Sequence, residues 1–116
     1  MKLTKMQTST LEIVAQKLTD IGLCTDHGTG WGYCCYEEED GAHFYIQFDD
    51  IVTIITPVGN SYAFEAVVDG DHMVESFEVE DPSRTMLMRA VIACIGASME
   101  KAFRLDWDGT IAQDCA

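Results

Sequence analysis

Residues 51–79 read IVTIITPVGNSYAFEAVVDGDHMVESFEV, and this stretch decides the fold class. It is rich in β-branched and aromatic residues, and in its second half apolar residues alternate with polar ones, which is the period of a half-buried strand. Proline, glycine, asparagine and aspartate interrupt it twice, as turns between antiparallel strands do. The pattern predicts strands at 51–56, 61–68 and 72–79, joined by turns at 57–60 and 69–71.

Glu75 breaks the alternation in the last of these strands. Phe77 and Val79 share the inner face and Glu78 lies on the outer face, so strict alternation places Glu75 on the inner face. A carboxylate among apolar neighbours is unfavourable, and we therefore expect a β-bulge or an early strand end at this position.

A further hairpin is predicted before residue 51. Phe44, Ile46 and Phe48 alternate with polar residues and face one side of a strand. The preceding residues include an aromatic run and then four consecutive acids. We expect a loop at 25–30, a strand at 31–37, a turn at 38–41 and the returning strand at 42–48.

Two amphipathic helices flank the strands. Ser9-Thr10-Leu11-Glu12 is a capping-box sequence, and the apolar spacing after it predicts a helix over 9–21 with Gly22 in the left-handed position that ends it. Asp81-Pro82 predicts a second helix start, with the helix running over 82–103. The apolar face of this helix is expected to comprise Met86 or Leu87, Ala90, Val91, Cys94, Ile95, Ala97 and Met99.

The predicted order is α-β-β-β-β-β-α. This is an α+β fold, with a mainly antiparallel sheet packed with two amphipathic helices. We expect residues 1–105 to form a single domain and residues 106–116 to form a short polar C-terminal tail. The sequence leaves open whether both helices cover the same face of the sheet.

The charge excludes several partners. The net charge is −13, from twenty acidic and seven basic residues, and the segment between Lys17 and Arg84 holds fifteen acids without a Lys or Arg. Such a surface repels phosphates, so we expect no direct nucleic-acid binding and no membrane binding. No apolar leader segment follows the N-terminus, and five cysteines without paired spacing fit a reducing compartment, so a cytoplasmic location is expected.

No motif predicts catalysis or a cofactor. Cys34 and Cys35 are adjacent on a predicted strand, where their side chains point to opposite faces and cannot easily ligate one metal. Residues 106–110, DWDGT, resemble the D-x-D-G-T signature of haloacid-dehalogenase-type phosphatases, but six residues after Thr110 leave no room for the later motifs of that family. We expect no enzyme activity, no cofactor and no metal site; a small enzyme is the least favoured alternative.

The acid-rich segment is predicted to be a binding surface. Like charges without a counter-charge destabilise the compact state, but they complement a cationic partner. We expect them to bind a basic groove of a protein that normally holds nucleic acid, with carboxylates in place of phosphates. The predicted contacts are Glu37, Glu38, Glu39, Asp40, Asp49, Asp50, Asp69 and Asp71, with Tyr33, Tyr36 and Tyr45 as aromatic anchors.

The size, the acidity and the element order resemble those of small phage-encoded anti-defence proteins, including anti-CRISPR proteins. The order also resembles phage ABA-sandwich proteins, whose final helix carries an R-A-x-x-A-like stretch; RAVIA at 89–93 is the corresponding stretch here. The resemblance implies inhibition of a nucleic-acid-targeting effector complex by occupation of its basic groove, in the host cytoplasm for a phage-encoded protein.

A second hypothesis comes from another class of proteins. Type III secretion chaperones are also small, acidic, cytosolic α/β proteins with a helix at each end, and they bind unfolded segments as homodimers. Met86, Met88 and Met99 suit an apolar groove of that kind, although ordinary core packing explains them as well. Under this hypothesis the protein is a homodimer, and the oligomeric state separates it from a monomeric inhibitor.

Overall fold

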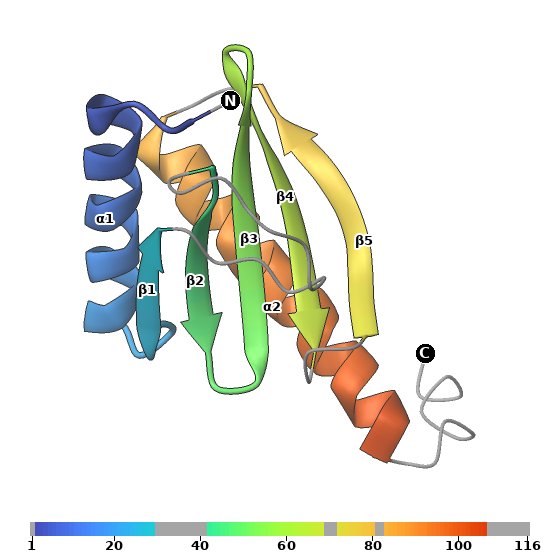
Figure 1. Ribbon diagram of the computed structural model, residues 1–116. Helices are drawn as coiled ribbons and strands as arrows, with labels where there is room; N and C mark the ends of the chain where they lie inside the picture. The colour runs from blue at the N-terminus through green and yellow to red at the C-terminus, as the bar shows by residue number, and fades with distance from the viewer. Residues whose placement is uncertain (1, 30–41, 69–71, 81–82, 107–116) are drawn as a thin grey trace.

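A computed structural model of the 116-residue chain describes residues 2–29, 42–68, 72–80 and 83–106 (Figure 1). The predicted α+β fold and element order are confirmed. The elements are α1 (Lys5–Asp20), β1 (Asp26–Thr29), β2 (Phe44–Phe48), β3 (Ile51–Val58), β4 (Ser61–Val68), β5 (His72–Val79) and α2 (Arg84–Asp106).

The five strands form one antiparallel meander in the order β1-β2-β3-β4-β5, so each strand pairs with its neighbour in sequence. Both helices lie on the same face of this sheet: α1 packs beside β1 and β2, and α2 crosses behind β3, β4 and β5 (Figure 1). The question that the sequence leaves open is therefore settled in favour of a two-layer arrangement.

The main core lies between the helices and the sheet. Phe44 and Phe64, both fully buried, fill its centre, and the helices contribute apolar residues at helical spacing. The buried helix residues in this cluster are Leu11, Val14, Ala15, Leu18, Leu87, Ala90, Val91, Cys94 and Ile95. A smaller cluster, consisting of Val52, Ile54 and Val67 with Tyr45 packed against it, lies on the face of the sheet away from the helices. The sheet is thus apolar at its centre on both faces.

Helix α1 begins earlier than the sequence pattern predicts. Its N-cap is Thr4: the Gln7 N–H donates to Thr4 Oγ1 at 3.0 Å, and the Thr4 N–H donates to Gln7 Oε1 at 2.8 Å. The predicted capping box at Ser9 is wrong, because Thr4-x-x-Gln7 provides the same reciprocal bonds five residues earlier. The predicted end is confirmed, since Gly22 has a φ of 81° and its N–H donates to the Thr19 carbonyl at 3.0 Å.

The loop predicted at 25–30 is wrong, because residues 26–29 form β1. This strand pairs with β2 in the register Asp26↔Gln47 to Thr29↔Phe44. Its sequence, DHGT, has little intrinsic strand propensity, and pairing with β2 rather than local preference makes it a strand. The strand predicted at 31–37 and the turn at 38–41 lie outside the described residues.

Strand β3 is two residues longer than predicted, and the turn after it is correspondingly tighter. Pro57 pairs with Tyr62, and only Gly59 and Asn60 remain between β3 and β4. Pro57 is tolerated because β2 extends along β3 only as far as the pair Phe44↔Ile55, so its missing N–H faces no neighbouring strand there.

The irregularity expected at Glu75 is confirmed. Phe64 pairs with Phe77 and Ala66 pairs with Val74, so one residue of β4 lies opposite two residues of β5, at positions 75 and 76. The extra residue is a β-bulge, and it restores the alternation that places Val79 in the core.

Helix α2 starts at Arg84 rather than at the predicted residue 82. The Met86 N–H donates to Ser83 Oγ at 3.3 Å, so Ser83 caps the helix, and the predicted cap at 81–82 lies outside the described residues. The predicted apolar face is wrong at Ala97 and Met99, which are exposed; Ser98 takes the buried position. The helix continues to Asp106, and the rest of the predicted tail lies outside the described residues.

Candidate functional site

A cluster of exposed carboxylates lies at one end of the molecule, and we name it the acidic end: Asp20, Asp26, Asp49 and Asp50. Helix α1 ends at Asp20, and β1 begins at Asp26. Asp49 and Asp50 form the turn between β2 and β3. The chain directions bring these three segments to the lower end of the view in Figure 1.

Hydrogen bonds hold the segments of the acidic end together. The Thr25 N–H donates to the Gln47 carbonyl at 2.7 Å, and the Asp49 N–H donates to Thr25 Oγ1 at 3.1 Å. The Gln47 side-chain amide donates to the Asp49 carbonyl at 2.8 Å. The β2–β3 turn is therefore tied to the chain just before β1, which fixes the positions of its two carboxylates.

Asp49 has a φ of 52°, the left-handed conformation that Asp and Asn adopt more readily than other non-glycine residues. It is the first of two residues between Phe48 and Ile51, which pair with each other at the end of the hairpin. A two-residue hairpin turn requires this conformation, so the tightness of the turn places two adjacent carboxylates at its tip.

The carboxylates of the acidic end have no cationic partner within the described part of the chain. Asp20 accepts a hydrogen bond from Gln16 Nε2 at 3.0 Å and forms no ion pair with Lys17, one turn before it. Asp26 accepts from the His27 N–H and from the Tyr45 hydroxyl, both at 2.9 Å. Neutral donors thus orient these groups while their charges stay uncompensated.

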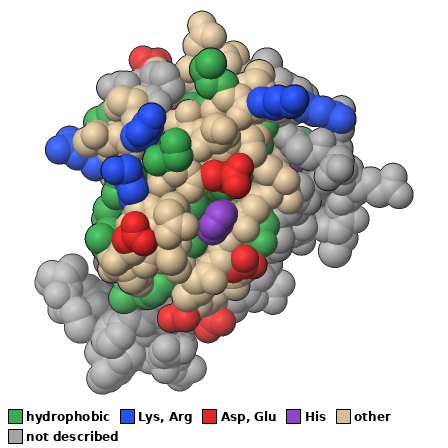
Figure 2. Space-filling view, turned by 90° about the vertical axis from the view of Figure 1, so that its left-hand side faces the viewer, with side chains coloured by type: hydrophobic (Ala, Val, Ile, Leu, Met, Phe, Trp, Pro, Cys, Tyr) green, Lys and Arg blue, Asp and Glu red, His purple; other side chains and the backbone are tan. Residues whose placement is uncertain are grey.

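Most of the described cations lie toward the opposite end. Lys5 and Arg84 are the first residues of α1 and α2, and both helices begin at the upper end in Figure 1. Figure 2, which faces the α1 side, shows Lys and Arg side chains gathered in the upper part and most Asp and Glu side chains over the middle and lower parts. On this face, the charges of the described residues are therefore separated along the molecule.

Of the predicted contact residues, Asp49, Asp50 and Tyr45 lie in the described part of the chain. The first two belong to the acidic end, and Tyr45 binds Asp26 there. The remaining predicted contacts lie outside the described residues: Tyr33, Tyr36, Glu37, Glu38, Glu39, Asp40, Asp69 and Asp71.

Sequence reasoning missed Asp20 and Asp26 as members of this surface. Both lie in the segment without Lys or Arg, but the loop predicted at 25–30 gave Asp26 no fixed position next to β2. The position of Asp26 follows from strand pairing, because polar Asp26 on β1 lies opposite polar Gln47 on β2.

The described residues provide no metal centre: no group of three or more His, Cys, Asp or Glu side chains among them is arranged to hold an ion. His43 Nδ1 lies 2.8 Å from Thr56 Oγ1, and the His27 ring stacks on Phe44 with centroids 6.1 Å apart. Both histidines thus contact neighbours in the sheet. Cys34 and Cys35 lie outside the described residues.

The thiol of Cys94 lies in the core. Burial raises its pKa to about 12, and the neighbouring Thr53 hydroxyl acts in the opposite direction. Ser98 Oγ is itself buried without a hydrogen-bond partner among the described residues. A thiol with this pKa is protonated at neutral pH and is a poor nucleophile.

No family model, curated protein or solved structure matches this chain. Within the residues that the structure describes, no helix is long and apolar enough to cross a membrane. The functional argument therefore depends on the geometry and charge of the chain itself.

Proposed function

We propose that this protein acts through its acidic end, which binds a cationic groove on another protein. The observation that carries the proposal is the set of exposed carboxylates, Asp20, Asp26, Asp49 and Asp50, without Lys or Arg partners in the described chain. An arginine or lysine of a partner supplies the counter-charge that this end lacks. Charge complementarity of this kind raises the association rate and suppresses wrong partners.

The groove of the partner is one that otherwise holds nucleic acid. Regularly spaced arginine and lysine side chains in such a groove neutralise phosphates, and adjacent carboxylates satisfy the same donors. Binding of this protein then excludes the nucleic acid, so the outcome is inhibition without catalysis. An anti-CRISPR-like, phage-encoded inhibitor in the host cytoplasm is the form of this proposal that the sequence resemblance favours.

The test uses two variants with equal net charge. The acidic-end variant carries Asp20→Asn, Asp49→Asn and Asp50→Asn; it keeps Asp26, because Asp26 holds Tyr45. The control variant carries Glu12→Gln, Glu78→Gln and Glu80→Gln, which are exposed positions outside the acidic end. Both remove three charges, so any difference between them reports the position of the charge rather than its amount.

Each variant is used to capture partners from a bacterial lysate at low salt, and the captured protein is then challenged with duplex DNA. We expect wild type and the control variant to retain a nucleic-acid-binding effector that DNA displaces, and the acidic-end variant to lose it. A third variant, neutral at residues 37–40, tests the contacts that lie outside the described residues. If the partner is captured equally by all variants, or if DNA does not compete, the proposal is wrong.

The chaperone hypothesis gains little from the described core. Met86 and Met88 pack against the main core, so they are not free to line a groove, while Met99 is 52% exposed. Size-exclusion chromatography with light scattering measures the oligomeric state directly, and a monomer argues against this hypothesis.

A further inference from the structure

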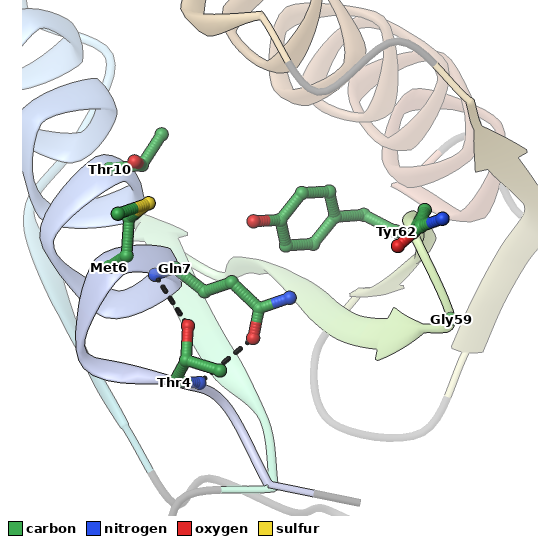
Figure 3. A pocket seen from close by; sticks show the side chains of 7 residues that line it. Thr4, Met6, Gln7, Thr10, Gly59 and Tyr62 are labelled. Carbon is green, nitrogen blue, oxygen red and sulfur yellow. Dashed lines mark hydrogen bonds between the residues drawn. The ribbon is translucent and has the colours of Figure 1, made fainter.

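A hollow of about 460 Å³ lies between the first turns of α1 and the turn that joins β3 to β4 (Figure 3). Thr4, Met6, Gln7 and Thr10 line it from the helix, and Asn60 and Tyr62 line it from the hairpin. This volume is in the range of sites that hold small molecules. The hollow lies at the end of the sheet opposite the acidic end, so it is separate from the proposed partner surface.

Tyr62 is the buried polar group of this hollow. Its side chain is only 4% exposed and its ring belongs to the main core. Its hydroxyl points from β4 toward α1, into the hollow, and forms no hydrogen bond with any described residue (Figure 3). Burial also raises the pKa of Tyr62, so the hydroxyl keeps its proton and is available as a donor. The hydroxyl is therefore an unpartnered donor that opens on the hollow, where a ligand can accept from it.

The capping box of α1 supplies further donors. Gln7 Oε1 accepts from the Thr4 N–H, and Thr4 Oγ1 accepts from the Gln7 N–H, so both side chains are held in place by the cap. The donors that the cap does not use are the Gln7 amide N–H₂ and the Thr4 hydroxyl hydrogen. Figure 3 shows the Gln7 amide nitrogen directed toward the hollow, on the side of Tyr62.

The rest of the lining is uncharged and consists of Met6, Thr10, Gly59 and Asn60. Met6 is 79% exposed beside the hollow, and its thioether offers a polarizable contact to an apolar or aromatic body. No Lys, Arg, Asp or Glu is among the lining residues, and the net charge of −13 disfavours an anion as the ligand.

We infer that this hollow binds a small uncharged molecule whose carbonyl oxygen accepts from the Tyr62 hydroxyl and the Gln7 amide, with its apolar body against Met6. The site goes beyond the proposed partner surface and does not depend on it. The fixed cap geometry of Thr4 and Gln7 holds one donor in place before the ligand arrives, which reduces the entropy lost on binding.

Benzamide is the test probe, because it combines an amide carbonyl with an aromatic body; benzyl alcohol, which lacks the carbonyl, is the matched control. Amide NMR spectra of the labelled protein are recorded with each probe up to roughly 20 mM, since a molecule this small is expected to bind weakly. We expect benzamide to produce saturable shifts at Gln7, Asn60 and Tyr62, and to bind at least several-fold more tightly than benzyl alcohol.

Tyr62→Phe keeps the ring and removes the hydroxyl, and it is expected to weaken benzamide binding by about fivefold to tenfold, as the loss of one hydrogen bond does. Tyr45→Phe removes a hydroxyl on another part of the sheet and leaves the affinity unchanged. Met6→Ala, at a position where the side chain is 79% exposed, is expected to weaken binding by loss of the apolar contact. No saturable shifts, equal affinity for both probes, or full benzamide affinity in Tyr62→Phe would overturn the inference.

Discussion

The hydroxyl of Tyr45 on β2 donates a hydrogen bond to Asp26 Oδ2 on β1, with the two oxygens 2.9 Å apart. Tyr45 lies opposite Gly28 in the sheet, and a Cβ built on this glycine would lie 3.3 Å from the tyrosine ring. The ring therefore covers the glycine and reaches along β1 to Asp26. The pKa of Tyr45 is raised. Partial burial is the larger cause, and the hydrogen bond to Asp26 is the second.

Tyr45→Phe removes this bond and is expected to lower the free energy of unfolding by about 0.5 kcal/mol, since the bond is at the exposed edge of the sheet. Because the pKa of Tyr45 is raised in the folded state, its contribution is present below pH 10.0 and is lost as the pH rises through the folded pKa. The difference between the ultraviolet titrations of tyrosinate in wild type and in the variant isolates the titration of Tyr45. A difference titration with its midpoint at or below pH 10.0 would contradict the raised pKa of Tyr45.

Thr4→Ala is expected to destabilise the protein by about 1 kcal/mol, because it removes the N-cap acceptor of α1. Ser9→Ala, at the position where the sequence pattern predicts a cap, lies inside the helix and is expected to be neutral or slightly stabilising. Urea unfolding of the two variants measures the difference. A larger loss for Ser9→Ala than for Thr4→Ala contradicts the observed helix start.

The buried thiol of Cys94 is expected to make the free energy of unfolding depend on pH under alkaline conditions. Its pKa is about 12 when folded and 9.0 in the unfolded chain, so the folded state favours the neutral thiol and loses stability as pH rises above 9.0. The expected loss is about 1–2 kcal/mol near pH 10.5, judged against Cys94→Ala, which lacks this contribution. Urea unfolding at pH 8 and pH 10.5 checks it, and an equal pH dependence in both proteins contradicts it.

Repulsion among the carboxylates of the acidic end is expected to lower the free energy of unfolding. Neutralising Asp20, Asp49 and Asp50 relieves repulsion and raises the free energy of unfolding by about 0.5–1 kcal/mol at low salt. Asn is suited to position 49, because it also adopts the left-handed conformation seen there. The gain is expected to shrink at high salt and to exceed that of the Glu12, Glu78 and Glu80 control variant. Equal gains would mean that net charge alone, rather than its clustering, is responsible.

The sequence predicts those elements whose apolar pattern is strong. Strands β4 and β5 and the bulge near Glu75 follow from alternation, and the end of α1 follows from Gly22. Strand β1 is not predictable in this way, because Asp26–Thr29 becomes a strand only by pairing with β2. Ser98 takes a position expected for apolar residues, which local hydrophobicity does not reveal.

Only part of the candidate site is predictable from the sequence. The lack of Lys and Arg between Lys17 and Arg84 identifies an acidic surface, and the Asp49–Asp50 pair follows from the same feature. The hollow at Tyr62 leaves no comparable pattern, because its two walls are about fifty residues apart and meet only when α1 packs beside the β3–β4 turn.

The central claim is that the acidic end, rather than the overall charge, recognises a cationic surface. The most direct measurement is the affinity of an arginine nonapeptide for wild type, the acidic-end variant and the equally charged control variant, by calorimetry at low and at physiological salt. We predict that the acidic-end variant binds about tenfold more weakly than the control, since each exposed ion pair contributes about 0.5 kcal/mol. Equal affinities for the two variants would contradict the claim.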